Sequence, residues 1–278
     1  MRDDNRRTAN HVAGSADAQV NGAVPCSETV ASGVFRRIEP PAVFRSIAGC
    51  HAVSLIPNAT AEAGRDATTI ERSGAELPAE LSRAVESRRR SFLAGRHCAE
   101  RALAEAGHPW PIPALAIGAR GAPVFPDGFI GSITHSARLA AAVALRASTV
   151  RAVGIDCELL MDMSVADEVV GRVLPEAASL GIRRGEIASL RWPDFVTAVF
   201  SAKESLYKCL APVCGVFFDF DAMRLDAIDS ATMQFTLLHS LGTVFAAGER
   251  FTAVFSVDTE HAFTAVTLAA GAQQQVRA

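Results

Sequence analysis

Apolar residues recur along the chain with two spacings, one typical of helices and one of strands. Over residues 79–106 they keep roughly helical spacing, and Gly107 and Pro109 follow where that helix must end. Asp194–Leu210 carries a second apolar stripe, and Pro193 stands where the first turn of a helix tolerates proline. The pattern predicts one strong helix in each segment.

Short apolar runs bounded by turn residues predict strands elsewhere. They fall within 34–57 and at Ala114–Ile117, Gly131–His135, Leu139–Leu145, Val150–Leu159, 217–225, 231–241, 250–258 and 262–269. Residues 58–77 are typical of a loop, and 160–192 is predicted to be helical with breaks at Pro175 and Gly181. Two helices, each followed by strands, predict an α+β fold with two halves of similar make-up.

The same pattern suggests where the chain divides. Residues 1–30 are rich in small and polar residues and are expected to be a disordered leader. The joint between the halves is expected just before Gly154, which gives an N-terminal half at 31–152 and a C-terminal half at 153–278.

Composition excludes several classes of protein. The 278 residues are 49% hydrophobic and 21% charged with a net charge of −3, so the chain is not a globally basic nucleic-acid binder. It has no apolar run long enough to predict a membrane span, and its N-terminus lacks the apolar core of a secretory signal. Six cysteines without a CxxC pair are expected to be reduced thiols in a cytoplasmic protein.

Arginine far outnumbers lysine among the positively charged residues. Only Lys203 and Lys208 are lysines among 27 lysines and arginines, and they flank Glu204. Codon usage in a GC-rich genome explains a preference for arginine. Two lysines retained in one short segment nevertheless suggest a need for ammonium groups at that place.

The sharpest local signal is the sequence VGIDCE at 153–158. Side chains alternate along a strand, so Gly154, Asp156 and Glu158 share the face opposite the core residues. Paired carboxylates that leave coordination positions open suit magnesium bound to phosphates, and Gly154 would leave room for a ligand. The alternative is a solvated strand edge that carries two acids.

The second signal lies on the helix that carries the lysines. Glu204 and Lys208 are one turn apart and share a face with Ser201, whereas Lys203 points about 140° away from Lys208. The structural alternative is a solvated ion pair, which contributes only a few tenths of a kcal/mol.

The third and fourth signals are cationic. Arg88 and Arg96 belong to an arginine-rich stretch of the first helix, and arginine suits phosphate recognition. Arg120 occupies a turn rich in Gly and Pro, and His135 ends a predicted strand. The alternatives are a solvated basic face and a structural histidine.

These segments together resemble the 4′-phosphopantetheinyl transferases, specifically the group acting on carrier proteins of siderophore, nonribosomal peptide and polyketide synthesis in secondary metabolism. The matching stretches are RRRSFLAGRHCAERAL, RGAPVFPDGFIGSITHS, VGIDCE and FSAKESLYK. They extend from about residue 80 to 220. The resemblance implies two pseudo-symmetric α+β halves with the active site in the cleft between them.

The resemblance also implies a reaction. Phosphopantetheine would pass from coenzyme A to a serine hydroxyl of an apo-acyl or peptidyl carrier protein, with Mg²⁺ as cofactor and adenosine 3′,5′-bisphosphate released. The implied metal ligands are Asp156, Glu158 and Glu204; the implied catalytic residues are Glu204 as base, Lys208 at the pyrophosphate and His135 on a phosphate. The implied coenzyme A-binding residues are Arg88, Arg96, Arg120, Thr134, His135, Asp156, Lys203 and Lys208.

Two other functions remain open at this point. A magnesium-dependent hydrolase of nucleotides or coenzyme A could share the three acids, and a non-catalytic carrier-binding module could share the fold. Carrier proteins of this class usually present an acidic helix, which would bind a basic surface. The expected docking segment is therefore 160–192, which carries Arg172, Arg183 and Arg184. We expect a monomer with no nucleic-acid or membrane partner.

Overall fold

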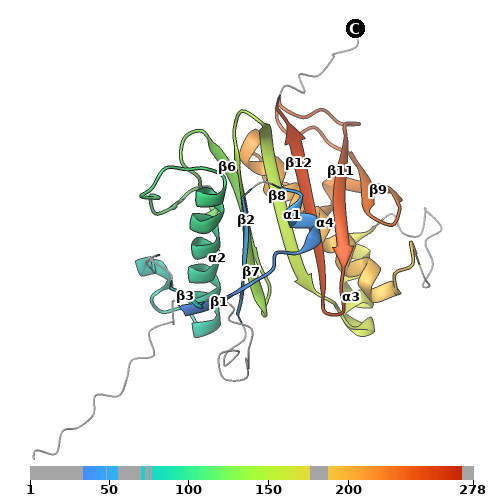
Figure 1. The fold of residues 1–278 in the computed structure, drawn as a ribbon. Coiled ribbons are helices and arrows are strands. Elements are labelled where there is room, and N and C mark those ends of the chain that lie inside the picture. The colour runs from blue at the N-terminus through green and yellow to red at the C-terminus, as the bar shows by residue number, and fades with distance from the viewer. Residues whose placement is uncertain are drawn as a thin grey trace, which may run out of the picture. The chain divides into compact units, whose positions relative to one another are not determined.

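Two antiparallel five-stranded sheets form the framework, and one long helix covers a face of each (Figure 1). The first sheet has the order β3-β1-β2-β7-β6 and the second β8-β12-β11-β10-β9. This computed structural model describes residues 34–47, 49–55, 70–72, 75, 77–175 and 187–270. The predicted leader, most of the loop at 58–77, Gly181, Arg183 and Arg184 lie outside them. No helix within the described residues is both long and apolar enough to cross a membrane.

The elements have the following bounds. The first half contains β1 (Val34–Ile38), α1 (Ala42–Arg45), β2 (Cys50–Ser54), β3 (Ile70–Arg72), α2 (Glu86–Glu105), β4 (Ala116–Ile117), β5 (Pro123–Val124), β6 (Phe129–His135) and β7 (Leu139–Arg146). The second contains β8 (Val150–Leu159), α3 (Met163–Val173), α4 (Trp192–Cys214), β9 (Met223–Ile228), β10 (Thr232–Leu237), β11 (Arg250–Val257) and β12 (His261–Ala269). The predicted α+β class is confirmed.

Several predicted boundaries need correction. The helix predicted from residue 79 begins at Glu86, because Val85 is extended and separates it from a short 3₁₀ turn. The helix predicted to end at Leu210 continues to Cys214, where the left-handed Gly215 ends it. The strand predicted from residue 217 begins only at Met223. Pro175 does follow the end of α3, as predicted.

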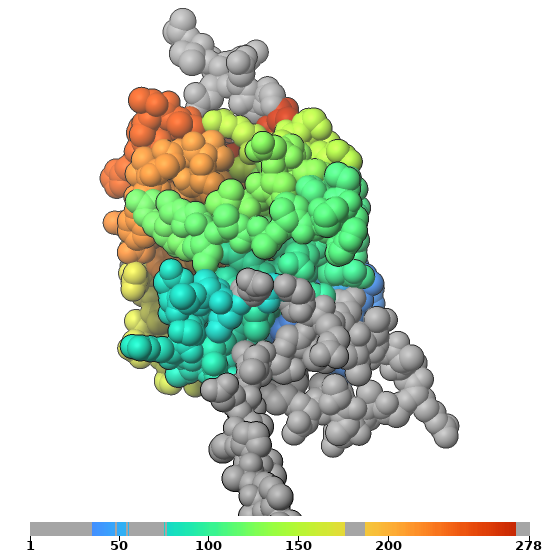
Figure 2. Space-filling model, turned by 90° about the vertical axis from the view of Figure 1, so that its left-hand side faces the viewer, coloured from blue at the N-terminus to red at the C-terminus, as the bar shows by residue number. Residues whose placement is uncertain are grey.

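Three apolar clusters hold these layers together. One lies between α2 and the first sheet, and another between α4 and the second sheet. The third joins the remaining faces of the two sheets, with Phe44 of α1 and Phe263 of β12 packed edge to face in it. Helix α2 and the segment that follows it cover the face of the first half shown in Figure 2. Because residues from both sheets contribute to the third cluster, the two halves share part of their hydrophobic core.

The two sheets meet where the edge strands β6 and β8 run alongside each other. Side-chain hydroxyls join them: Ser132 Oγ accepts the N–H of Ile155 at 3.1 Å, and Thr134 Oγ1 accepts the N–H of Cys157 at 3.0 Å. The hydroxyls therefore satisfy edge amides that would otherwise be orphaned. We call this β6–β8 contact the seam. Strand β8 begins at Val150 and lies wholly in the second sheet, so the expected joint just before Gly154 falls within this strand, and the division at 152/153 stays a prediction.

Candidate functional site at the seam

Strand β8 carries its acids as the alternation predicts. Ile155 and Cys157 are fully buried in the shared core, while Asp156 faces α4. The prediction that Gly154 leaves room for a ligand is wrong, because α4 fills the space beside it. A Cβ there would collide with the backbone of α4 at Ser205 and Cys209. Glycine at 154 thus allows α4 to lie close to β8, which brings the helix side chains up to Asp156.

Asp156 is 2% exposed and receives hydrogen bonds from two elements, β6 and α4. Lys208 Nζ lies 2.5 Å from Oδ1, Thr134 Oγ1 donates to Oδ1 at 3.1 Å, and Ser201 Oγ donates to Oδ2 at 2.8 Å. Thr264 of β12 extends the network, with its Oγ1 2.9 Å from that of Ser201. A buried carboxylate needs such partners, so this part of the site is fixed by its packing.

The other two acids are less enclosed. Burial and the charge of Asp156 raise the pKa of Glu158 to about 7, with Lys208 opposing and Glu204 adding to the rise. Burial also raises the pKa of Glu204, although Lys208 opposes this shift. Burial disfavours the charged form of Lys208, but the charge of Asp156, its hydrogen bond and the charge of Glu204 together leave the pKa of Lys208 raised. The site holds more negative charge than Lys208 alone offsets.

This donor chemistry suits a hard divalent cation, because all three acids offer oxygen and share excess negative charge. Within the described residues, however, no three His, Cys, Asp or Glu side chains are already arranged to hold a metal ion. The ammonium of Lys208 holds the oxygen of Asp156. Asp156, Glu158 and Glu204 lie in one region of the protein, and their role as metal ligands stays a prediction.

Two residues of the predicted coenzyme A-binding set, from different elements, come together beside this network. Arg88 of α2 is exposed, and its Nη1 lies 3.5 Å from His135 Nε2 at the end of β6. The pKa of His135 is lowered, first by partial desolvation and then by the charges of Lys208 and Arg88. The charges of an arginine from the first half and a lysine from the second thus both act on His135, an arrangement that suits an anion.

Three other predicted ligands turn toward the protein. Arg96 is 6% exposed and donates to the carbonyl oxygens of Leu115 and Ala116 at 2.9 and 3.3 Å. Lys203 is 2% exposed and donates to the carbonyl oxygen of Phe220 at 2.9 Å. Thr134 points into the seam. Their predicted contacts with coenzyme A are not tested by these distances, but each has a structural partner.

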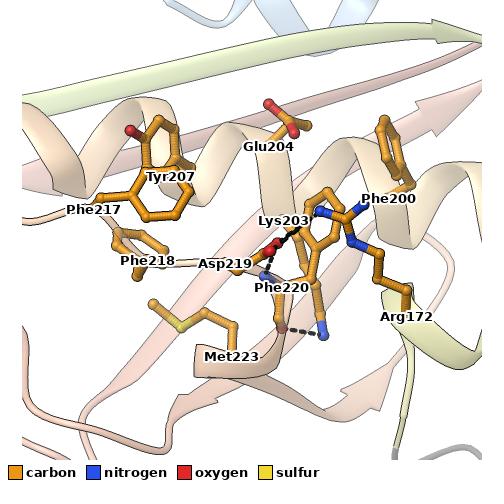
Figure 3. A pocket seen from close by; sticks show the side chains of 10 residues that line it. All are labelled: Arg172, Phe200, Lys203, Glu204, Tyr207, Phe217, Phe218, Asp219, Phe220 and Met223. Atoms are coloured by element: carbon orange, nitrogen blue, oxygen red, sulfur yellow. Dashed lines mark hydrogen bonds and ion pairs between the residues drawn. The ribbon is translucent and has the colours of Figure 1, made fainter. Parts of the chain in front are cut away.

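Next to Glu204 the surface opens into a pocket of about 320 Å³ (Figure 3). Its lining residues are Arg172, Phe200, Lys203, Glu204, Tyr207, Phe217, Phe218, Asp219, Phe220 and Met223. Most of these side chains are aromatic or apolar, and they come from α3, α4 and the segment after α4. Arg120, from the first half, lies over the ring of Phe217 with its guanidinium carbon 5.8 Å from the ring centroid. The predicted Arg120 is thereby placed beside the pocket wall.

The pocket wall formed by residues 217–220 is not predicted by the sequence analysis. Its segment, 217–220, was predicted as a strand, but it is irregular and is held from two sides. Lys203 binds the carbonyl of Phe220, and Arg172 lies 3.2 Å from Asp219 Oδ2. The available signal was the sequence FFDF, three phenylalanines among four residues that begin two positions after the glycine that ends α4.

Two matching domains cover most of the described chain. Residues 77–145 match the 4′-phosphopantetheinyl transferase N-terminal domain, and residues 152–266 match the 4′-phosphopantetheinyl transferase superfamily. The boundary between these matches falls close to the turn that separates the two sheets. The matches include helices α2, α3 and α4, the hydrogen bonds of the seam, and the pocket described above.

Individual relatives agree with the domain matches. The chain is 38% identical over 166 residues to 4′-phosphopantetheinyl transferase Svp of Streptomyces mobaraensis, covering 58% of this chain and 63% of that protein. It is 37% identical over 146 residues to PptT of Mycobacterium tuberculosis, covering 51% and 59%. It is 35% identical over 169 residues to enterobactin synthase component D of Escherichia coli, covering 60% and 74%. The chain thus spans about three-fifths of the length of the first two of these relatives.

Fold and site define a class of protein: two α+β halves joined at a seam, with acids and cations gathered beside an apolar pocket. The sequence matches identify that class. The chain belongs to the 4′-phosphopantetheinyl transferase superfamily.

Proposed function

We propose that this protein transfers 4′-phosphopantetheine from coenzyme A to a serine hydroxyl of an apo-carrier protein and releases adenosine 3′,5′-bisphosphate. One observation carries the proposal. Helix α4 presents Lys208 to Asp156 and, one turn earlier, Glu204 to the apolar pocket. A charged site that adjoins a pocket with mostly aromatic and apolar lining matches a ligand with a pyrophosphate and a long uncharged chain.

The two parts of the site divide the substrate between them. Arg88 and His135 suit the phosphates of the nucleotide end, and Lys208 suits the pyrophosphate as a compact charge. The pocket lined by Phe200 and Tyr207 suits the pantetheine chain. This assignment places the reacting phosphorus near Glu204, between the charged and apolar parts.

The reaction is a displacement at the phosphorus that bears pantetheine. The serine oxygen bonds to this phosphorus, and the pyrophosphate bond to the nucleotide breaks. Glu204, whose pKa is raised by burial, takes the serine proton directly or through water. Lys208 stabilises the charge that develops on the leaving bisphosphate. Asp156, Glu158 and Glu204 would hold Mg²⁺, which when bound supplies neutralising charge to phosphoryl transfer.

The decisive assay combines the protein with coenzyme A, Mg²⁺ and a panel of apo-carriers from siderophore, polyketide and fatty-acid synthesis. We expect at least one carrier to gain the mass of one phosphopantetheine, as read by mass spectrometry. A parallel reaction without carrier tests the hydrolase alternative. Release of nucleotide from coenzyme A in that reaction, with no carrier modified in the first, would overturn the proposal.

Carrier docking is proposed at segment 160–192. Arg172 is the described member of its cationic set, and its side chain is 72% exposed on α3. Reversing Arg183 and Arg184 to Glu should raise the KM for the carrier and leave coenzyme A binding unchanged. An unchanged carrier KM would refute this docking segment.

A further inference from the structure

The tips of two hairpins, one from each sheet, meet just beyond His135. Ser136 follows β6 in the first hairpin, and His261 begins β12 in the second. Ser136 Oγ lies 3.1 Å from His261 Nε2, and the two residues are 8% and 4% exposed. This hydrogen bond therefore joins the halves in a site from which water is excluded, where it is worth more than on the surface.

The direction of the bond follows from the other partners of the serine. Ser136 Oγ accepts the N–H of Arg138 at 3.1 Å and that of Leu139 at 3.3 Å. A hydroxyl has two acceptor positions and one donor, so its own proton goes to His261 Nε2. His261 is thereby the acceptor. Burial lowers its pKa, opposed by Asp258 and Glu260 and aided by Arg138, which keeps the ring neutral for this role.

His261 is itself held firmly in the second half. Its backbone N–H donates to Asp258 Oδ1 at 2.7 Å, and its ring stacks on Phe263 with the ring centroids 5.5 Å apart. In the sheet it pairs with Leu159, at the end of the strand that carries Asp156 and Glu158. The ring of His261 therefore extends from β12, the neighbour of the acid-bearing strand β8, to the turn after His135.

We infer that His261 is a positioning residue that acts through Ser136 to hold His135 where it receives a phosphate of coenzyme A. The inference rests on the proposed function. His135 directly precedes Ser136, and its ring must stay beside Arg88 while its backbone ends β6. Fixing the next residue to the second half sets the separation between His135 and the acids of β8.

The test uses His261→Phe, which keeps a ring for the contact with Phe263 but removes the acceptor. We expect the KM for coenzyme A to rise about fivefold, the ratio expected for one neutral hydrogen bond. The turnover number should stay within about twofold and the carrier KM should not change. Ser136→Ala should act in the same direction, and the double variant should be no worse than Ser136→Ala.

The matched control is Glu260→Gln, which breaks the neighbouring exposed ion pair with Arg138 at the same hairpin tips. It should leave all three constants unchanged. NMR signals of the His135 ring provide a readout independent of turnover, and they should shift in His261→Phe but not in Glu260→Gln. If the wild-type protein modifies carriers but His261→Phe leaves the KM for coenzyme A and the His135 signals unchanged, the positioning role is wrong. If the wild-type protein modifies no carrier, the proposed function fails instead.

Discussion

Helices α2 and α4 use their cations in parallel ways. Each long helix carries one cation toward the seam, Arg88 in α2 and Lys208 in α4. Each also buries a second cation that binds backbone carbonyls of its own half: Arg96 binds the segment at 115–116, and Lys203 binds Phe220. The two halves therefore share a plan in which one cation lies at the seam and the other binds the surrounding chain.

The difference between the helices lies in how tightly the outward cation is held. Lys208 has a buried partner in Asp156, whereas Arg88 is exposed and has His135 at 3.5 Å. Gly154 lets α4 lie close to its sheet, which fixes Lys208 against β8. The α4 side is thus preorganised around charge, whereas under the proposed function the exposed Arg88 on the α2 side would adjust to the nucleotide end of coenzyme A.

The largest expected effect comes from the centre of the preorganised side. Asp156→Asn keeps the volume of the side chain but removes the charge that Lys208 neutralises. We expect transfer to fall on the order of 10³-fold or more, and removal of divalent metal by a chelator to have a similar effect. The measurement is the initial rate of carrier modification by mass spectrometry.

Asp229→Asn is the matched control for Asp156→Asn, because Asp229 caps an exposed turn between β9 and β10. Its transfer rate should equal that of the wild-type protein. Normal transfer by Asp156→Asn would show that Asp156 is not a metal ligand, whatever Asp229→Asn does.

The next effect tests whether an ammonium is required on α4. Lys208→Arg keeps the positive charge but replaces a compact group with a planar fork beside a buried carboxylate. We expect kcat to fall about 10- to 100-fold, while the thermal midpoint changes little because the ion pair with Asp156 persists. A full transfer rate in Lys208→Arg would mean that codon usage alone explains the two lysines.

The third prediction separates the two arginines of α2. Arg88→Gln should raise the KM for coenzyme A about tenfold, the loss expected for a charged hydrogen bond, without lowering the thermal midpoint. Arg96→Gln should instead lower the midpoint, because it leaves the carbonyls of Leu115 and Ala116 without their donor. Thermal melts and coenzyme A titrations of both variants decide the matter. Equal effects on KM with no loss of stability would place Arg96 at the ligand after all.

These contrasts show which features of the site could be predicted from the sequence. The alternation along β8 was sufficient to orient Asp156, because a short side chain on a regular strand must point to the face that its position in the alternation assigns. Helical spacing likewise placed Glu204 and Lys208 on one face. Arg96 and Lys203 could not be placed, since long side chains can turn toward any carbonyl within reach, and these two do so.

The rest of the site depends on contacts between distant segments. The space beside Gly154 is filled by α4, which lies about fifty residues later in the sequence. The pocket wall at 217–220 follows from the partners of Lys203 and Arg172 rather than from its own pattern. The link between Ser136 and His261 spans 125 positions, and no local periodicity predicts it.

The smallest expected effect concerns Arg172 at the pocket rim, where two roles compete. It pairs with Asp219 of the pocket wall, and it belongs to the segment proposed to meet the carrier. The pair is exposed, so its loss should change the stability by at most about 1 kcal/mol. Arg172→Gln should raise the carrier KM about two- to threefold, because one guanidinium facing an acidic helix is lost.

Asp219→Asn separates the two roles, because it breaks the same pair while an asparagine can still accept the hydrogen bond from the N–H of Phe220. If Arg172 serves the carrier, Asp219→Asn frees its guanidinium and the carrier KM should stay the same or fall. If Arg172 serves the wall instead, both variants should raise the KM for coenzyme A and leave the carrier KM unchanged. Steady-state titrations of both substrates with the two variants therefore decide whether the cation at the rim of α3 faces the partner protein or the pantetheine pocket.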